Sequence, residues 1–166
     1  MYGGASYKGA ESMDRPLSVL LIEDELAACQ EMITQIEVTS NITLVGVTNN
    51  IIKAMESVTD SLLDAIILDL ELHKGYGNGI TSLDSLRKME LHVSIYVLVT
   101  TNNTSHVTHD SVRKMGADFT MVKSQEDYSA KGMVEFLCSL KNIIQSNRKS
   151  SRNIFYLFCR NRSTDV

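Results

Sequence analysis

Short apolar runs alternate with amphipathic stretches from Leu17 almost to the end of the chain. The runs are rich in leucine and β-branched residues and show no strict polar alternation, which is typical of strands buried on both faces of a parallel sheet. The last run is the weakest. The pattern predicts five buried strands, at residues 17–22, 42–47, 65–70, 93–99 and 118–122.

The stretches between and after these runs carry apolar residues at helical spacing. They predict five helices, marked by Leu26, Met32, Ile33 and Ile36; by Ile51, Ile52, Met55 and Val58; by Ile80, Leu83, Leu86 and Met89; by Val107 and Val112 within 105–115; and by Met133, Phe136, Leu137, Leu140 and Ile144. Strands that alternate with single helices predict an α/β fold, a right-handed doubly wound parallel sheet. In such a sheet ligands bind outside the carboxyl ends of the strands.

Acidic, hydroxyl and basic side chains stand at the carboxyl ends of four predicted strands. They are Glu23, Asp24 and Glu25 after the first strand, Asp69 and Glu71 at the third, Thr100 and Thr101 after the fourth, and Lys123 after the fifth. Taken singly, the acids are typical of a helix start or an Asx turn, and the lysine of a surface position. Their order and their common edge of the sheet favour one shared site.

The chemistry of these groups suits phosphoryl transfer. Oxygen ligands from carboxylates are what Mg²⁺ takes, together with phosphate oxygens and water. The Asp69 carboxylate can act as a nucleophile that accepts a phosphoryl group. A threonine hydroxyl and the Lys123 ammonium would then neutralise and position the phosphoryl oxygens.

Length and composition limit the chain to one domain with a short appendage. The 166 residues include 43% apolar and 22% charged residues, which is ordinary globular usage and argues against a disordered or fibrous chain. The formal net charge of -4 is unevenly spread. Residues 147–166 carry +4, and residues 1–146 carry 11 basic and 19 acidic groups, a net charge of -8.

The three cysteines, Cys29, Cys138 and Cys159, are widely spaced and form no C-x-x-C pair, so neither a disulfide framework nor a zinc site is indicated. A reducing cytoplasm fits this usage best. No apolar run is long enough to cross a membrane, and residues 1–15 lack the apolar core of a signal peptide. We interpret residues 1–15, rich in Gly, Ser and Ala, as a flexible leader.

Four sequence segments, in order and at plausible spacing, carry a specific resemblance. LSVLLIEDE resembles the opening strand and acidic pair of the receiver domains of two-component response regulators, and IILDLELHKGYGNGI their phosphoacceptor strand and following loop. VLVTTN is similar to their switch-hydroxyl strand, and KMGADFTMVKS to their last strand with its lysine. The resemblance implies a receiver domain over residues 16–146. The implied fold is flavodoxin-like, a five-stranded parallel sheet of order 2-1-3-4-5 with five helices.

The resemblance implies a signalling switch rather than a turnover enzyme. A sensor histidine kinase or phosphotransfer protein would supply a phosphoryl group to Asp69, and a downstream protein or effector domain would read the result. Mg²⁺ would be held by Asp24, Asp69 and the backbone carbonyl of Glu71, and Glu23 would hold a water of the cation. The sequence implies no membrane contact, and no nucleic-acid contact by this domain.

Two further roles follow from the same resemblance. Lys123 would pair with the phosphoryl group, and a threonine would bond one of its oxygens and shift the fourth helix and fifth strand. Counting back from Lys123 favours Thr101 for that role, whereas the strand pattern also allows Thr100.

The chain departs from the family pattern at three positions. His73 and Ser124 stand where the family commonly has proline, and Thr120 stands where it has an aromatic switch residue. These departures motivate one alternative, a pseudo-receiver that binds partners without phosphorylation. A phosphohydrolase with Asp69 as nucleophile is a weaker alternative, because such enzymes usually have an aspartate where this chain has Glu71.

The basic segment 147–166 mixes arginines with the apolar run 154–158. That composition is compatible with a nucleic-acid contact, a membrane-surface helix, a docking strand or the stub of an effector domain. About 20 residues cannot make a second core. We interpret this segment as a stub or a disordered end.

Overall fold

The structure is a computed structural model that describes residues 15–50, 53, 56, 63–72, 79–88 and 94–162. For residues 148, 149 and 151–162 only the backbone is described. The predicted leader, residues 1–15, lies outside this part of the chain except for Arg15.

The strands form one parallel sheet of order β2-β1-β3-β4-β5, as the sequence predicts. All neighbouring strands are parallel, so strands that follow each other in the sequence need a crossover connection. The sheet extends from β1 in both directions, to β2 on one side and to β3 on the other, which makes it doubly wound. The strands are β1 (Leu17–Ile22), β2 (Ile42–Thr48), β3 (Ala65–Asp69), β4 (Tyr96–Thr101) and β5 (Phe119–Val122).

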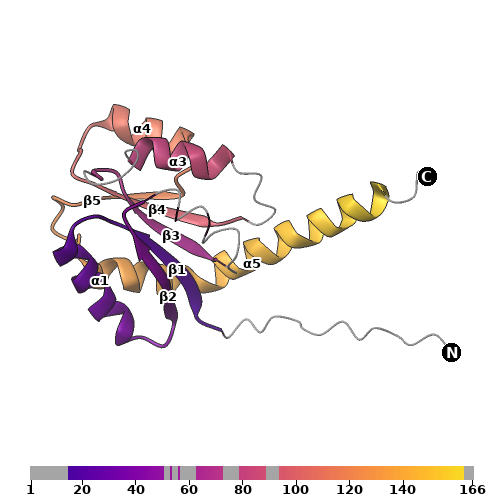
Figure 1. Ribbon diagram of the computed structural model, residues 1–166, viewed down its shortest axis with the longest axis horizontal. Helices are drawn as coiled ribbons and strands as arrows, with labels where there is room; N and C mark the ends of the chain where they lie inside the picture. Colours follow the sequence, from indigo (N-terminus) through magenta and orange to yellow (C-terminus); the bar gives the residue numbers. More distant parts are fainter. Residues whose placement is uncertain are drawn as a thin grey trace.

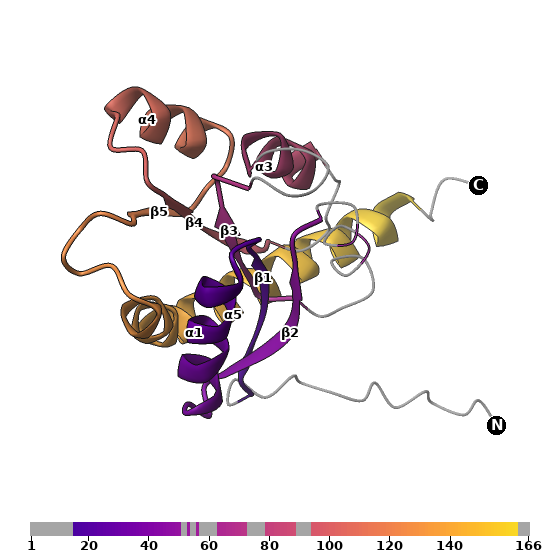
Figure 2. The same ribbon diagram turned by 60° about the vertical axis from the view of Figure 1, so that its left-hand side comes forward.

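Helices cover both faces of the sheet (Figures 1 and 2). In both views α1 and α5 lie on one side of the strands, and α3 and α4 lie on the other. A second helix was predicted from residues that lie outside the described part of the chain: Ile51, Ile52, Met55 and Val58. Between them the structure describes only Lys53 and Glu56, and both are helical. The described helices are α1 (Leu26–Glu37), α3 (Gly79–Lys88), α4 (His106–Lys114) and α5 (Ala130–Arg162).

Two hydrophobic cores result, one on each face of the sheet. Successive residues of β1 alternate between them: Leu20 and Ile22 belong to one core, and Leu17, Val19 and Leu21 to the other. The first core is completed by the α3 and α4 residues Leu83, Leu86 and Val112, and the second by the α1 and α5 residues Cys29, Met32, Ile36, Met133, Leu137 and Ile144.

The fourth strand differs from its prediction at both ends. It begins at Tyr96 and continues through Thr101, whereas the apolar run covers 93–99. Its last two residues pair with neighbours on both sides, Asp69 with Thr100 and Thr101 with Val122. The ladder therefore extends over two threonines that are buried although they are polar, and hydropathy alone does not mark them as strand.

The last helix is longer than its apolar face predicts. α5 runs over 33 residues to Arg162, and its later part extends away from the sheet (Figure 1). Ile144 and Gln145 are its last buried residues among the side chains that the structure describes. No described helix combines the length and the apolar character that a membrane span needs.

Candidate functional site

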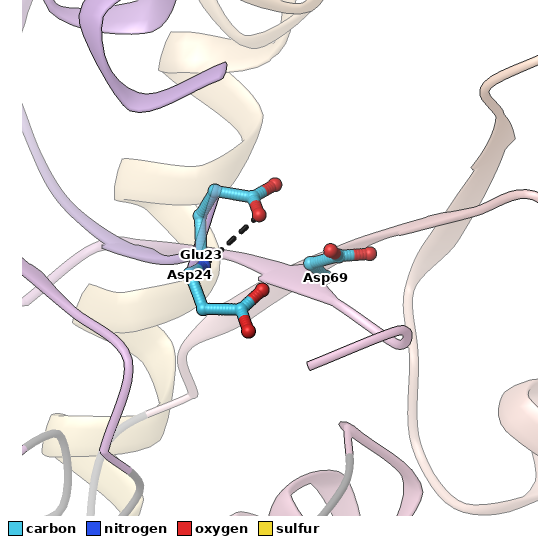
Figure 3. Close-up of side chains that lie close together, drawn as sticks. All are labelled: Glu23, Asp24 and Asp69. Carbon is cyan, nitrogen blue, oxygen red and sulfur yellow. Dashed lines mark hydrogen bonds between the residues drawn. The ribbon is translucent and has the colours of Figure 1, made fainter. Parts of the chain in front are cut away.

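Three carboxylates meet at the carboxyl end of the sheet. Glu23 and Asp24 follow β1, Asp69 ends β3, and one oxygen of each lies within 4.8 Å of the others. Figure 3 shows the Glu23 and Asp24 side chains extending from the end of β1 to the side on which Asp69 lies. Glu23 and Asp69 are buried, with 6% and 3% of their surface exposed. Such a concentration of buried negative charge needs a cation to balance it.

Glu23 also shapes the turn that carries Asp24. Its Oε1 accepts hydrogen bonds from the backbone N–H groups of Asp24 and Glu25, both at 3.0 Å. Burial raises the pKa of the Glu23 carboxyl, and the charge of Asp69 adds to this, while the Glu25 N–H acts in the opposite direction. The turn thus keeps a buried carboxyl beside the other two acids.

Among the described residues, the positively charged side chain of Lys123 faces the acids. Its Nζ lies 2.9 Å from Asp69 Oδ1 and 3.7 Å from Glu23 Oε2. Its backbone N–H donates to the carbonyl of Thr101, which places the lysine at the end of β5. Burial lowers the pKa of Lys123, but the hydrogen bond and charge of Asp69 and the charge of Glu23 outweigh this and raise it above its ordinary value. The ammonium therefore stays charged.

The two candidate threonines face opposite sides of the sheet. Thr100 is paired with Asp69 across the parallel ladder, so the two side chains share a face. Thr101 follows it and donates from its Oγ1 to the Glu71 carboxylate. The Asn102 backbone N–H donates to the other Glu71 oxygen at 2.9 Å.

Glu71 therefore does not join the acidic cluster with its side chain, which is occupied by Thr101 and Asn102. Its backbone N–H donates to Asp69 Oδ1 at 3.1 Å, so the residue still touches the phosphoacceptor candidate. The expected cation contact was through the Glu71 backbone carbonyl, and that expectation stays a prediction.

Gly79 fixes the approach of α3 to this edge. A Cβ at this position would lie 2.3 Å from Leu70 Cα and 2.5 Å from the Asp69 carbonyl oxygen, distances that no side chain tolerates. The Gly79 N–H donates to the Leu70 carbonyl at 3.2 Å. The first helical residue of α3 therefore packs directly on the backbone that carries Asp69.

Tyr128 belongs to the site although the sequence did not single it out. It lies in the turn between β5 and α5, and the charges of Lys123, Glu23 and Asp69 all act on its hydroxyl. Burial raises the pKa of Tyr128, whereas the charge of Lys123 and the Thr100 hydroxyl lower it. A tyrosine five residues after the lysine belongs to no sequence motif. Only the path of the chain after β5 places Tyr128 at the site.

A pocket of about 230 Å³ adjoins the acids. Its walls come from β1, β3 and β4, from α1, and from the turn into α5. The lining includes Glu23, Thr100, Lys123, Tyr128, Ala28 and Ala130.

The positions that depart from the family pattern have different outcomes. His73 lies outside the described residues. No described peptide bond is cis, so the Lys123–Ser124 bond is trans, and Lys123 still reaches Asp69. Thr120 is half-buried on β5.

The donor set fits a hard divalent cation. Carboxylate oxygens from two turns converge within 4.8 Å, which suits Mg²⁺ with its preference for a few carboxylates, water and phosphate oxygens. Lys123 neutralises only part of the charge of three acids. These residues therefore have the chemistry to hold Mg²⁺.

A family model described as the response regulator receiver domain matches residues 19–134. None of the curated proteins matches the sequence.

The structural comparisons agree with the family match. A DNA-binding response regulator of the LuxR family from Staphylococcus aureus is 22% identical with a TM-score of 0.64, covering 75% of this chain and 98% of its own. A CheY-like response regulator receiver domain protein from Methanospirillum hungatei JF-1 is 12% identical with a TM-score of 0.64, covering 79% and 98%. The response regulator domain of Thermotoga maritima CheB is 18% identical with a TM-score of 0.60, covering 81% and 98%. At these identities the likeness shows the fold.

Proposed function

The chain belongs to the response regulator receiver domain family, and from this premise we propose that it accepts a phosphoryl group on Asp69. One observation carries the proposal: the Lys123 ammonium lies 2.9 Å from Asp69 Oδ1 inside a cluster of three carboxylates. A buried aspartate held by a lysine beside a cation-binding set is equipped to act as a nucleophile toward a phosphoryl group.

In the proposed reaction an Asp69 carboxylate oxygen attacks the phosphorus of a phosphohistidine on a sensor kinase or phosphotransfer protein. The new P–O bond forms as the P–N bond breaks, and the departing imidazole takes up a proton. Lys123 neutralises a phosphoryl oxygen and keeps the Asp69 carboxylate oriented.

Mg²⁺, when bound, offsets the negative charge of the phosphoryl oxygens. Asp24, Asp69 and the backbone carbonyl of Glu71 would hold it, and Glu23 would hold a water of its hydration shell. The Glu23 side chain already accepts a hydrogen bond of 3.0 Å from the Asp24 backbone N–H, which supports a positioning role for Glu23.

We assign the switch hydroxyl to Thr100, with Thr101 as the competing residue. The shared face of Asp69 and Thr100 supports this choice, because a hydroxyl on that face can reach a phosphoryl oxygen. The Thr101 hydroxyl already donates to Glu71. Substitution of each threonine by valine tests the assignment: only Thr100→Val should reduce the stability of the phosphorylated state.

Receiver domains are generally signalling switches rather than enzymes. We propose that phosphorylation changes a surface that a downstream protein or effector domain reads, and that the protein works in the cytoplasm, where kinases and reduced cysteines are found.

Intact mass spectrometry after incubation with acetyl phosphate and Mg²⁺ tests the proposal. We expect wild type to gain one phosphate, Asp69→Asn to gain none, and omission of Mg²⁺ to abolish the gain. Asp84→Asn is the matched control, because Asp84 is a half-exposed acid of α3 that pairs only with Lys88 among the described contacts, and it should behave as wild type. No gain in folded wild type would favour the pseudo-receiver instead, and equal gain in Asp69→Asn would exclude Asp69 as acceptor.

A further inference from the structure

The later part of α5 stands apart from the rest of the fold. The helix continues to Arg162, and this part extends away from the strands (Figures 1 and 2). Among the side chains that the structure describes, Ile144 and Gln145 are the last buried ones of α5, and Asn147 and Ser150 are exposed. We call residues 147–162 the basic helix. Its backbone is helical although no described side chain of this segment belongs to either core.

The basic helix differs in charge from the body of the chain. It carries five basic and no acidic residues, whereas residues 1–146 carry 11 basic and 19 acidic groups. An anionic surface attracts the first set of charges and repels the second. An anionic partner would therefore meet the basic helix and not the acidic body.

The basic helix also has an apolar side. Successive residues of an α-helix are about 100° apart, so the sequence and the helical backbone give each residue its position around the axis. Ile154, Leu157 and Phe158 lie within one arc of about 100°. Four of the five basic residues lie within an arc of about 120° on the opposite side: Arg148, Lys149, Arg152 and Arg160.

The two arcs distinguish between classes of partner. The phosphates of a nucleic acid would account for the basic arc but leave the apolar arc without a role. A second copy of the chain could cover the apolar arc in a coiled coil, but it would bring together two segments of the same charge. An anionic membrane surface uses both arcs, because lipid phosphates attract the basic residues and the acyl chains accept the apolar ones.

We propose that the basic helix binds the surface of a membrane that contains anionic lipids. The helix would lie in the plane of the interface, with its apolar arc toward the acyl chains and the acidic body on the aqueous side. The expectation of no membrane contact rested on the lack of a segment that could span a bilayer, and no described helix could do so. An interfacial helix does not need to span it.

Co-sedimentation of the full chain with lipid vesicles tests the proposal. Wild type should bind vesicles of phosphatidylglycerol mixed with phosphatidylcholine, and should bind phosphatidylcholine alone at least about tenfold more weakly. High salt should release it, because salt screens exposed charges. The triple variant Arg148→Gln, Lys149→Gln, Arg152→Gln should bind the mixed vesicles about 100-fold more weakly, since each basic residue near an anionic surface contributes about fivefold.

The matched control removes the same charge from the body of the chain. Arg113, Lys114 and Lys131 are exposed residues of α4 and the start of α5, and their joint replacement by glutamine should leave vesicle binding unchanged. An equal loss in this control would show that net charge alone causes the binding, which overturns the role of the basic helix. Absence of binding by wild type, or equal binding to neutral vesicles, also overturns it.

A tryptophan probe tests how the helix lies. The chain contains no tryptophan, so a single introduced one reports on one position. Phe158→Trp places the probe in the apolar arc, and Tyr156→Trp places it on the basic arc, about 160° away. With mixed vesicles the emission of Phe158→Trp should shift to shorter wavelength and resist quenching by iodide, and Tyr156→Trp should change much less. Equal changes at both positions would contradict the proposed orientation.

Two further measurements separate the proposal from its competitors. Tighter binding to duplex DNA than to mixed vesicles would assign the basic helix to nucleic acid and overturn the membrane contact. Self-association that Leu157→Asn abolishes, in a chain that does not bind vesicles, would assign it to a second copy. Asp69→Asn should bind vesicles as wild type does, so failure of the membrane contact and failure of phosphoryl transfer to Asp69 are distinguishable.

Discussion

Glu23 combines two tasks that conflict in the metal-free protein. It caps the turn after β1 through two backbone N–H groups, and it adds a third carboxylate to a buried cluster. Burial raises its pKa, because the charged form loses hydration that the two N–H groups and Lys123 replace only in part. The free energy of unfolding should therefore depend on the charge of this one residue.

The sign of that dependence can be worked out. A carboxyl whose folded pKa is raised contributes stability that is complete below its ordinary pKa and is lost as pH rises through the folded pKa. Glu23→Gln removes the charge but keeps an acceptor for the turn. In metal-free buffer its free energy of unfolding should match wild type near pH 4 and exceed it at neutral pH, measured by urea denaturation across that range.

The control for Glu23→Gln is Glu31→Gln, on the exposed face of α1, which should change stability little at any pH. Addition of Mg²⁺ at neutral pH should stabilise wild type more than Glu23→Gln, because the variant has lost one anionic group of the site. An advantage of Glu23→Gln that is equally large at pH 4 would show that the ionised carboxylate is not the cause.

At this scale the sequence predicted that the acids and the lysine lie together, for a physical reason, and their roles stay predictions. Parallel strands end at one edge, so residues that follow apolar runs must meet there, as Glu23, Asp69 and Lys123 do. The Glu71 side chain and Tyr128 were not predictable in this way. The contacts of Glu71 depend on the direction of its side chain, and the position of Tyr128 depends on the path of the loop after Lys123. No periodic pattern in the sequence indicates either of them.

Helix α3 shows how far periodicity determines one element. A three-residue spacing marks Ile80, Leu83 and Leu86, but only Leu83 and Leu86 are buried, at 0% and 2% exposure, while Ile80 is 38% exposed. Each residue of a helix turns by about 100°, so a three-residue step falls about 60° short of a full turn. The predicted face therefore drifts away from the sheet, and its start at Ile80 reaches solvent.

This difference predicts unequal costs for two similar substitutions. Leu83→Ala leaves a cavity in the core between α3 and the sheet and should lower the free energy of unfolding by about 2–5 kcal/mol. Ile80→Ala on the same helix should cost about 1 kcal/mol or less, because much of its side chain is already hydrated. Urea denaturation of both variants measures the two costs, and similar losses would mean that Ile80 is as buried as Leu83.

Strand β4 shows where hydropathy fails to predict the end of an element. Its apolar run ends at Val99, but the ladder continues through Thr100 and Thr101, which are both buried. Thr100 lines the pocket beside the acids, and Thr101 donates to Glu71 on the other face of the sheet. A functional site places polar groups inside the fold, so the hydropathy pattern fails just where the chemistry lies. The predicted five-strand order is confirmed, since it depends on the connections and not on the ends of strands.

For the whole molecule, the two cores place the acidic site at one end of the sheet and a second polar cluster near the other. Arg15 pairs with the fully buried Asp64 at 2.6 Å, and the Gln145 side chain donates to the Arg15 carbonyl at 3.0 Å. This cluster joins the start of the chain, the strand edge and α5. It includes Gln145, which with Ile144 is the last buried part of α5 among the side chains that the structure describes.

That arrangement predicts where the folded unit ends. A chain ending at Asn147 keeps Ile144 and Gln145 and loses only the part of α5 beyond the sheet. Its free energy of unfolding should stay within about 0.5 kcal/mol of the full chain, because a helix segment without tertiary packing contributes little stability.

The matched truncation ends at Leu140 and removes Ile144 and Gln145 with the last turn on the sheet. Its free energy of unfolding should be lower by about 2–5 kcal/mol or more, since a buried isoleucine and the hydrogen bond to Arg15 both disappear. Thermal and urea denaturation compare the two chains. A large loss already at Asn147 would mean that the basic segment packs on the domain, and the expected boundary near residue 146 would be wrong. Retained stability at Asn147 would instead leave the basic helix free to serve as a connection to another part of a signalling protein.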